Sequence, residues 1–289
     1  MKIIRAEVLG WCMGVRRAVE IAEKAVETQK SPIYTLGPLI HNPSVLNSFK
    51  EKGVRILEEK DASLLPEHSS VIIRAHGTTP RILETLSGAG HEVLDATCPR
   101  VLASQKRALL WSEKGFTVII AGDRNHGEVL SIAGYAAGNA VVIENEADAV
   151  ALDVPQKSIL IAQTTFSPVL FEKISEILKN KNPSLSVFNS ICTATMERQN
   201  ALLELKGKAD GILVIGGKNS ANTRRLYEAA VALFKNAALI ENETEIPPAF
   251  FNMETVALTA GASTPDSIID AVEAALNPAA LVSANTLND

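Results

Sequence analysis

Short apolar runs bounded by polar turns recur along the chain, and amphipathic stretches follow several of them. After Cys12, the apolar positions Val15, Val19, Ala22 and Val26 have the spacing of one helical face. Apolar runs that end in glycine or polar turns are typical of buried strands, and they lie at residues 32–36, 71–74, 116–121, 158–161, 211–215 and 255–259. Strands that alternate with helices in this way predict parallel sheets covered by helices, the α/β class.

This pattern occurs three times, and each repeat opens with a cysteine that follows a β-like run. The cysteines are Cys12, Cys98 and Cys192, which are 86 and 94 residues apart. Each continues into a helical stretch, a strand with a polar turn, and a second strand with another polar turn. We therefore predict three α/β units, at residues 1–97, 98–191 and 192–276, with a poorly ordered C-terminal tail at 277–289.

The third unit has no closing strand of its own. We predict that residues 1–11, with a strand at 2–9, close its sheet and so tie the two ends of the chain together. If the units pack around a pseudo-threefold axis, the turns at the carboxyl ends of their strands converge on one central cavity. The expected architecture is a trefoil.

The polar turns carry hydrogen-bond donors at equivalent places. The first turn of each unit holds His41, His126 or Ser220, and the second holds His76, Thr164 or Ser263. Ala221 and Asn222 follow Ser220 in its turn. Such donors beside helix N-termini suit an anion with many acceptor oxygens, for example a diphosphate. Glu128, the carboxylate of the turn at 125–128, is either a proton donor or a first-turn glutamate that favours the helix dipole.

Composition narrows the class of function. The chain has 289 residues, 46% of them hydrophobic and 21% charged, which is a globular composition. Its apolar runs are far shorter than the ~20 residues of a membrane helix, and its N-terminus lacks a signal-peptide pattern, so we expect a cytoplasmic protein. A net charge of −5 without a basic run argues against nucleic acid. The basic pairs at 16–17 and 224–225 are expected on solvated helix faces, and 216–220 lacks the spacing of a nucleotide-binding loop.

Three cysteines without a CxxC pair are a poor disulfide framework and a poor zinc ribbon. Three thiolates from three units can instead hold a metal centre and leave one position free. Zinc with a water molecule and a [4Fe–4S] cluster with one iron lacking a thiolate both satisfy this description. The free position would be available to a substrate.

The residues and their order resemble one known family. The matching segments are CMGV at 12–15, GPLIHNP at 37–43, RAHG at 74–77, DATCP at 95–99, QTT at 163–165, GKNS at 217–220 and AGAS at 260–263. From Lys2 to about Ala275, the chain resembles the 4-hydroxy-3-methylbut-2-enyl diphosphate reductases, which complete the non-mevalonate isoprenoid pathway.

The resemblance implies a trefoil around a [4Fe–4S] cluster held by Cys12, Cys98 and Cys192. The unique iron would bind the C4 hydroxyl of the substrate, and two electrons and two protons would remove that oxygen as water. The products would be isopentenyl and dimethylallyl diphosphate. Because no GxGxxG follows a strand, we expect the electrons from an external protein of the ferredoxin or flavodoxin type.

The resemblance also assigns site residues by motif position. Glu128 would be the proton donor, with His126 and Thr164 beside it. The substrate would be held by His41, His76, His126, Thr164, Ser220, Ala221, Asn222 and Ser263. Two departures are Trp11, where the family usually has Phe, and Gly127, where it usually has Pro. Glycine loosens φ, so we expect a less well positioned Glu128 and no loss of turnover in Gly127→Pro.

Three other functions remain possible from the residues alone. A non-redox dehydratase, as in the threefold α/β quinolinate synthases, would use the cluster as a Lewis acid. Its carboxylate substrates would need arginine forks, where these turns carry His, Ser, Asn and Thr. An iron–sulfur sensor would need neither the donor ring nor Glu128. A zinc protein would differ in colour and iron content.

Overall fold

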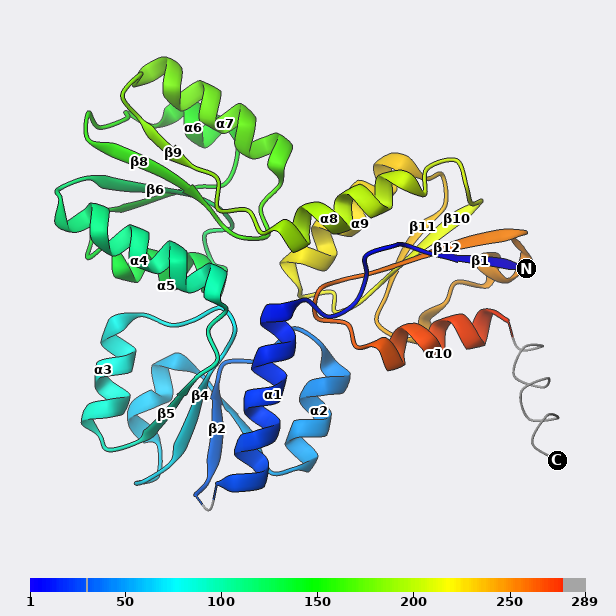
Figure 1. Cartoon of the computed structure of the whole chain (residues 1–289), viewed down its shortest axis with the longest axis horizontal. Helices are drawn as coiled ribbons and strands as arrows, with labels where there is room; N and C mark the ends of the chain where they lie inside the picture. Colours follow the sequence, from blue (N-terminus) through cyan, green and yellow to red (C-terminus); the bar gives the residue numbers. More distant parts are fainter. Residues whose placement is uncertain (30, 278–289) are drawn as a thin grey trace. The chain divides into compact units, whose positions relative to one another are not determined.

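The computed structural model describes residues 1–29 and 31–277, and in these residues it contains three four-stranded sheets (Figure 1). Every pair of neighbouring strands in them is parallel. Helices connect the strands, so the predicted α/β class is confirmed. The predicted tail lies, from residue 278 onward, outside the described residues. No helix of the described part is both long and apolar enough to cross a membrane.

The first sheet has the strand order β3-β2-β4-β5. Its strands are β2 Ile33–Leu36, β3 Arg55–Leu57, β4 Ser70–Ile73 and β5 Glu92–Asp95. The accompanying helices are α1 Met13–Thr28, α2 Pro43–Glu51, the 3₁₀ helix η1 Glu59–Leu64 and α3 Pro80–Gly88. All four residues of β4 are buried, and Val71 and Ile73 pack with Leu36 and Leu86 in one core cluster. This burial on both faces explains the continuous apolar run.

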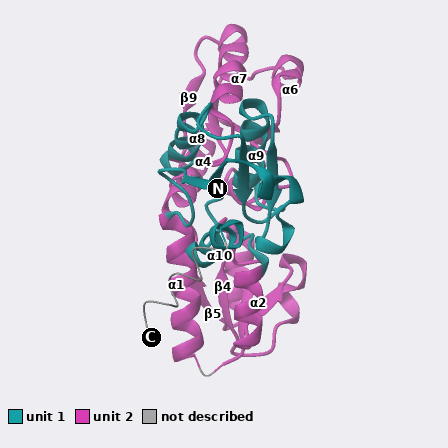
Figure 2. Cartoon of the chain, turned by 90° about the vertical axis from the view of Figure 1, so that its right-hand side faces the viewer, with its two compact units in different colours: residues 1–12, 41–43, 193–289 teal, residues 13–40, 44–192 magenta. Residues whose placement is uncertain are grey.

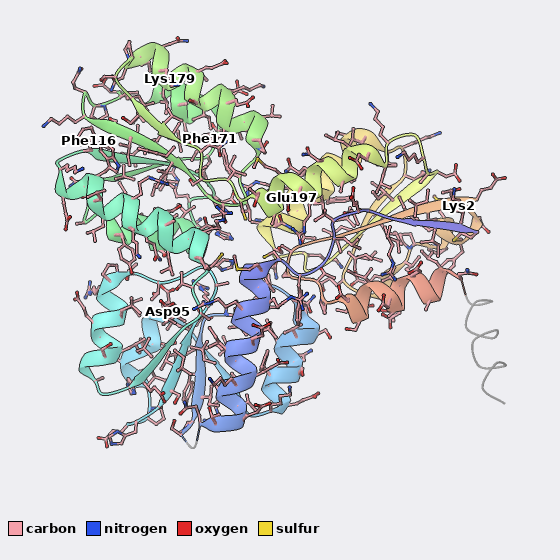
Figure 3. All side chains as sticks on the ribbon, in the orientation of Figure 1. Lys2, Asp95, Phe116, Phe171, Lys179 and Glu197 are labelled. Carbon is pink, nitrogen blue, oxygen red and sulfur yellow. The ribbon has the colours of Figure 1, made fainter. Side chains whose placement is uncertain are left out.

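The second sheet repeats the order, as β7-β6-β8-β9. Its strands are β6 Thr117–Ala121, β7 Ala140–Ile143, β8 Ser158–Ala162 and β9 Ser186–Phe188. Its helices are α4 Pro99–Glu113, α5 Gly127–Tyr135, α6 Glu146–Ala151 and α7 Pro168–Lys181. Phe116, labelled in Figure 3, packs edge to face on Trp111 of α4 with a centroid distance of 4.7 Å. Apolar side chains of α4 and α5 pack against those of β6 and β8 in one core cluster.

The third sheet joins the two ends of the chain, in the order β1-β12-β10-β11. Its strands are β1 Lys2–Arg5, β10 Gly211–Ile215, β11 Ala237–Ile240 and β12 Thr255–Ala260. Its helices are α8 Thr193–Glu204, α9 Ala221–Leu233 and α10 Asp266–Leu276, with 3₁₀ helices η2 Glu243–Glu245 and η3 Pro248–Asn252. Strand β1 pairs with β12 from Lys2 opposite Thr255 to Arg5 opposite Leu258. The expected N-terminal strand is therefore present but ends four residues earlier than predicted.

Side chains of β10 alternate between two cores. Leu213 and Ile215 pack in the cluster that contains Ile269 of α10, whereas Ile212 and Val214 pack in the cluster that contains Leu202 and Leu226 of α8 and α9. Successive residues of a strand point to opposite faces. The sheet is therefore covered by helices on both sides.

The chain separates into two compact units (Figure 2). In the described residues, unit 1 contains 1–12, 41–43 and 193–277, with the third sheet, and unit 2 contains 13–29, 31–40 and 44–192, with the other two sheets. Each unit is considered by itself below. The predicted boundaries at 97/98 and 191/192, and the trefoil arrangement, stay predictions.

Candidate functional site

The buried carboxylate of Glu128 is the centre of the candidate site in unit 2. Glu128 is the second residue of α5 and is 1% exposed. Its Oε1 accepts a hydrogen bond from the Thr164 N–H at 2.6 Å, and its Oε2 lies 2.7 Å from Thr164 Oγ1. Thr164 follows β8 and is itself buried. One threonine therefore contacts both oxygens of the carboxylate and fixes its orientation.

The start of α5 around Gly127 is capped, and the expected effect of Gly127 on the position of Glu128 stays a prediction. Gly127 is the first residue of α5, and His126 is its N-cap. The Nδ1 atom of His126 accepts a hydrogen bond from the Glu128 N–H at 3.2 Å. Glu128 is therefore hydrogen-bonded through its N–H as well as through its carboxylate.

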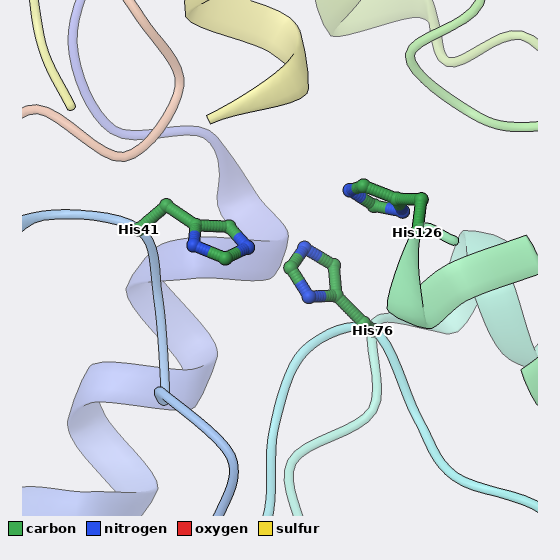
Figure 4. A group of neighbouring side chains, drawn as sticks. All are labelled: His41, His76 and His126. Atoms are coloured by element: carbon green, nitrogen blue, oxygen red, sulfur yellow. The ribbon is translucent and has the colours of Figure 1, made fainter. Parts of the chain in front are cut away.

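His76 and His126 lie against each other in the same unit (Figure 4). His76 follows β4, and its ring meets that of His126 edge to face, with centroids 4.7 Å apart and a 65° angle between the planes. Because Nδ1 of His126 accepts a hydrogen bond, a neutral His126 ring carries its proton on Nε2. The pair can therefore present N–H donors to an anion.

The two cysteines of unit 2 are tied to these same turns by backbone hydrogen bonds. The Cys98 N–H donates to the Ala75 carbonyl at 3.0 Å, next to His76, and the Cys192 N–H donates to the Thr164 carbonyl at 2.8 Å. A continuous path of contacts therefore runs from Cys98 through the histidine pair, Glu128 and Thr164 to Cys192. The repeat in the sequence predicted that these residues lie in equivalent turns. In unit 2 they are connected by contacts.

A buried polar cluster supports the His76 turn, and sequence reasoning missed it. The Nε2 atom of Gln105 on α4 donates to Ser131 Oγ on α5. A Cβ atom on Gly77 would lie 3.0 Å from that Ser131 oxygen and would overlap Gln105 Nε2. Gly77 has φ +73°, a conformation that favours glycine. Only tertiary packing reveals this cluster, because its members are far apart in sequence.

Arg17 is half-buried rather than on a solvated helix face, which corrects the prediction for this member of the basic pair; Arg16 is exposed, as predicted. Its guanidinium donates to the carbonyl oxygens of Thr97 and Asp95, each at 3.1 Å. These carbonyls belong to the segment that leads into Cys98. Arg17 of α1 therefore fixes the segment that precedes Cys98, a predicted metal ligand. The helical pattern alone could not indicate this contact.

Unit 1 gathers a second set of predicted residues around the His41 turn. Ser263 Oγ donates to the His41 carbonyl at 3.2 Å. The turn at 217–220 packs closely against the same carbonyl. A Cβ atom added to Gly217 would overlap the His41 oxygen. Ser220 is the N-cap of α9, and its Oγ accepts a hydrogen bond from the Thr223 N–H at 3.4 Å. The turns after β10 and β12 thus meet at His41.

Asn222 has an unused donor in this part of unit 1. Its side chain is 8% exposed, and its Nδ2 atom is buried without a hydrogen-bond partner in the described residues. Ala221, beside it, is the first residue of α9 and is buried. A buried donor at a helix N-terminus is the expected feature of a site for an anion.

Lys218 has a different role from the lysine of a phosphate-binding loop. Its Nζ donates to Glu245 Oε1 at 3.0 Å, and this hydrogen bond raises the pKa of Lys218 and lowers that of Glu245. The side chain is exposed.

Like the other two cysteines, Cys12 is hydrogen-bonded through its N–H to a turn that carries a predicted donor. Its N–H donates to the Ala262 carbonyl at 3.1 Å, next to Ser263. Arg198, which is 3% exposed, donates to the carbonyl of Gly10 and, at 2.7 Å, to that of Ala194. Each cysteine N–H therefore donates to the carbonyl of a predicted donor residue or to the carbonyl of the residue before it. The sequence repeat reappears as a repeat of hydrogen bonds.

We expect Gly217→Ala to destabilise the protein by about 1–3 kcal/mol, because the added Cβ overlaps a backbone oxygen that cannot move without displacing the His41 turn. The free energy of unfolding in urea measures the effect. Gly88→Ala is the control, since a Cβ atom on Gly88, the last residue of α3, meets open space. Equal stability of the two variants would contradict the packing described for Gly217.

Comparison with known proteins identifies the family. The model of the LytB protein family matches residues 3–277, almost the whole chain. The chain belongs to the LytB family. The resemblance seen in the sequence motifs is thereby confirmed.

Relatives of this LytB chain carry one name. A protein of Treponema denticola is 48% identical over 284 residues, which cover 94% of this chain and 98% of the relative. A protein of Thermoanaerobacter sp. is 40% identical over 274 residues, with 94% and 95% coverage. Both are named 4-hydroxy-3-methylbut-2-enyl diphosphate reductase.

Two solved structures share the LytB fold with this chain. The structure of (E)-4-hydroxy-3-methyl-but-2-enyl diphosphate reductase, the terminal enzyme of the non-mevalonate pathway, is 36% identical, with a TM-score of 0.72 and coverage of 96% of this chain and 100% of that one. The Plasmodium falciparum E-1-hydroxy-2-methyl-but-2-enyl-4-diphosphate reductase is 29% identical, with a TM-score of 0.87 and coverage of 92% and 85%.

The cysteines of this LytB chain fit a metal centre in their chemistry. All three are free thiols and are partly exposed. Cys98 is the N-cap of α4, and Cys12 and Cys192 directly precede α1 and α8. The thiolate is the form of cysteine that binds a metal. The donor set thus agrees with a thiolate-bound metal or cluster.

Proposed function

We propose that this chain reduces (E)-4-hydroxy-3-methylbut-2-enyl diphosphate to isopentenyl and dimethylallyl diphosphate. One C–O bond breaks, two electrons and two protons are consumed, and the oxygen leaves as water. The observation that carries the proposal is the contact path from Cys98 through His76, His126, Glu128 and Thr164 to Cys192. It combines metal ligands, anion donors and a buried carboxyl, and the named relatives support the same reaction.

Cys12, Cys98 and Cys192 would hold a [4Fe–4S] cluster. When bound, such a cluster supplies electrons one at a time and, with three thiolates, leaves one iron open. Zinc would suit the thiolates but could not deliver electrons. The reduction therefore favours the cluster over zinc.

The diphosphate would be bound by the donors of the polar turns. Imidazole N–H groups of His76 and His126 can donate to its oxygens. The unused Nδ2 of Asn222 and the N-terminus of α9, at Ser220 and Ala221, offer further donors. His41 and Ser263, which are hydrogen-bonded to each other, complete the set. Phosphate oxygens carry the charge that this many donors would stabilise.

Glu128 would supply a proton, with Thr164 as the group between the carboxyl and the substrate hydroxyl. The Thr164 hydroxyl lies 2.7 Å from Glu128 Oε2, so a proton can pass between them along an existing hydrogen bond. Burial keeps bulk water away from the carboxyl. The proton then goes to the substrate rather than to solvent.

The electrons would come from an external protein of the ferredoxin or flavodoxin type. The chain has no GxGxxG after a strand, which is the fingerprint of a nicotinamide or flavin site. A one-electron carrier also matches the one-electron steps of a cluster.

An anaerobic assay tests the proposal. The protein is loaded with iron and sulfide, reduced with dithionite and a viologen mediator, and given the hydroxylated allylic diphosphate. We expect both five-carbon products by mass spectrometry, and none from protein stripped of iron by a chelator. Cluster-loaded protein that releases no product would overturn the proposal.

A further inference from the structure

A pair of buried polar side chains joins α4 to α5 in unit 2. Gln105 of α4 is 2% exposed and Ser131 of α5 is 1% exposed, and Gln105 Nε2 donates a hydrogen bond to Ser131 Oγ. A buried polar group that loses its partner costs free energy, because water cannot replace the lost hydrogen bond. The two side chains therefore depend on each other's position.

The Ser131 hydroxyl extends this contact to the turn that carries His76. It donates to the Thr78 carbonyl at 3.4 Å, two residues after His76. Gly77, between them, lies against the pair, since a Cβ atom there would be 3.0 Å from Ser131 Oγ. A hydroxyl can accept one hydrogen bond and donate another. Gln105, Ser131 and the Thr78 carbonyl thus form one hydrogen-bonded chain, called the Gln105 junction below.

The Gln105 junction lies close along the chain to the site residues of unit 2. Ser131 comes three residues after Glu128 in α5, which places both on one face of the helix. Gln105 comes seven residues after Cys98, two helical turns into α4. The junction therefore connects the first turns of both helices to the His76 turn.

A second hydrogen-bonded link joins the same two helices at their other ends. Ser112, near the end of α4, is 7% exposed. Its Oγ donates to the carbonyl of Ala136, the C-cap of α5, at 2.7 Å and accepts from Asn139 Nδ2 at 3.1 Å. Ser112 thus supports the packing of α4 on α5 as the Gln105 junction does, but away from the site residues.

We propose that Gln105 and Ser131 are positioning residues for the reaction. Through the Thr78 carbonyl they set the place of the His76 ring, whose centroid is 4.7 Å from that of His126. Apolar packing between helices is non-directional, whereas hydrogen bonds have a preferred distance and angle. The junction therefore fixes a register that the apolar core alone leaves free. The roles of the two histidines rest on the proposed function.

Four variants of the cluster-loaded protein test the proposal. Ser131→Ala removes the hydroxyl, Gln105→Met keeps a long unbranched side chain without the amide, and the double variant combines them. Ser112→Ala is the matched control, because it removes a buried serine hydroxyl from the same pair of helices. The measurements are the Kd of inorganic pyrophosphate by calorimetry, anaerobic kcat and KM, the midpoint of thermal unfolding, and the separation of the His76 and His126 rings in crystals.

Ser131→Ala and Ser112→Ala are both expected to lower the unfolding midpoint by a few degrees. Only the junction variants are expected to lower kcat and pyrophosphate affinity, by at least about fivefold, and to separate the two rings by about 0.5 Å or more. Ser112→Ala should stay within about twofold of wild type. Because the junction acts as a unit, the double variant should be no worse than the more impaired single variant.

An unchanged ring separation in the junction variants, or losses of kcat and affinity equal to those of Ser112→Ala, would overturn the proposal. If Ser131→Ala does not fold, Ser131→Cys replaces it, since a thiol has a similar size and forms weaker hydrogen bonds. The ring separation does not depend on reduction of the substrate. Wild-type protein that forms no product therefore counts against the proposed function, and the ring separation still decides the role of the junction.

Discussion

Replacing Glu128 by glutamine is expected to lower kcat by a factor of about 10² to 10⁴, the usual size of a lost proton donor. Glutamine has the shape of glutamate, and its amide can keep both contacts with Thr164: the oxygen accepts from the N–H, and the nitrogen donates to Oγ1. The fold and the metal content should therefore stay as they are. Only the transferable proton is lost.

Single-turnover kinetics on anaerobic protein measure this effect, with iron content and visible absorption checked on the same samples. Thr164→Val removes the hydroxyl next to Oε2 and is expected to fall between wild type and Glu128→Gln. Glu113→Gln, an exposed carboxylate at the end of α4, is the control. A Glu128→Gln protein with more than about a tenth of wild-type turnover would exclude Glu128 as the main proton donor.

Removal of any one cysteine thiol is expected to abolish iron binding and turnover together. Three thiolates are already one fewer than most [4Fe–4S] clusters have, so two should not retain the cluster. Cys12→Ala, Cys98→Ala and Cys192→Ala should each give colourless protein after anaerobic loading. Iron and sulfide analysis is the measurement.

Trp11→Phe is the control for the cysteine variants, because it changes the neighbour of Cys12 and keeps all three thiols. It is expected to hold as much iron as wild type. A cysteine variant with a full complement of iron would exclude that cysteine as a ligand. Zinc in place of iron in the wild-type protein would favour the alternative that the sequence left open.

The sequence predicted the central strands of each sheet better than the edge strands. The apolar runs at 116–121 and 158–161 correspond to β6 and β8, whose inner residues are fully buried. The edge strands β3, β7 and β11 were not predicted, because they are short and largely half-buried or exposed. β3, for example, has three residues, of which two are exposed. Such strands lack the apolar signal that burial on both faces produces.

The candidate site was predicted where it follows chain order and was missed where it depends on packing. Equivalent turns identified His76, His126 and Thr164 because each turn ends a strand of a repeat. The guanidinium that fills the space beside Gly127 was not predicted, because the sequence shows only the freedom of a glycine backbone. Arg74 comes to Gly127 from 53 positions earlier in the chain. Spacing within a repeat carries no signal for such a contact.

The most direct test of the account is a count of electrons against product. Cluster-loaded protein is titrated anaerobically with a stoichiometric reductant in the presence of the hydroxylated allylic diphosphate, and both products are quantified. We expect two electrons consumed for each molecule of isopentenyl or dimethylallyl diphosphate formed. Conversion of the substrate without consumption of reductant would contradict a reductase and favour a non-redox dehydratase.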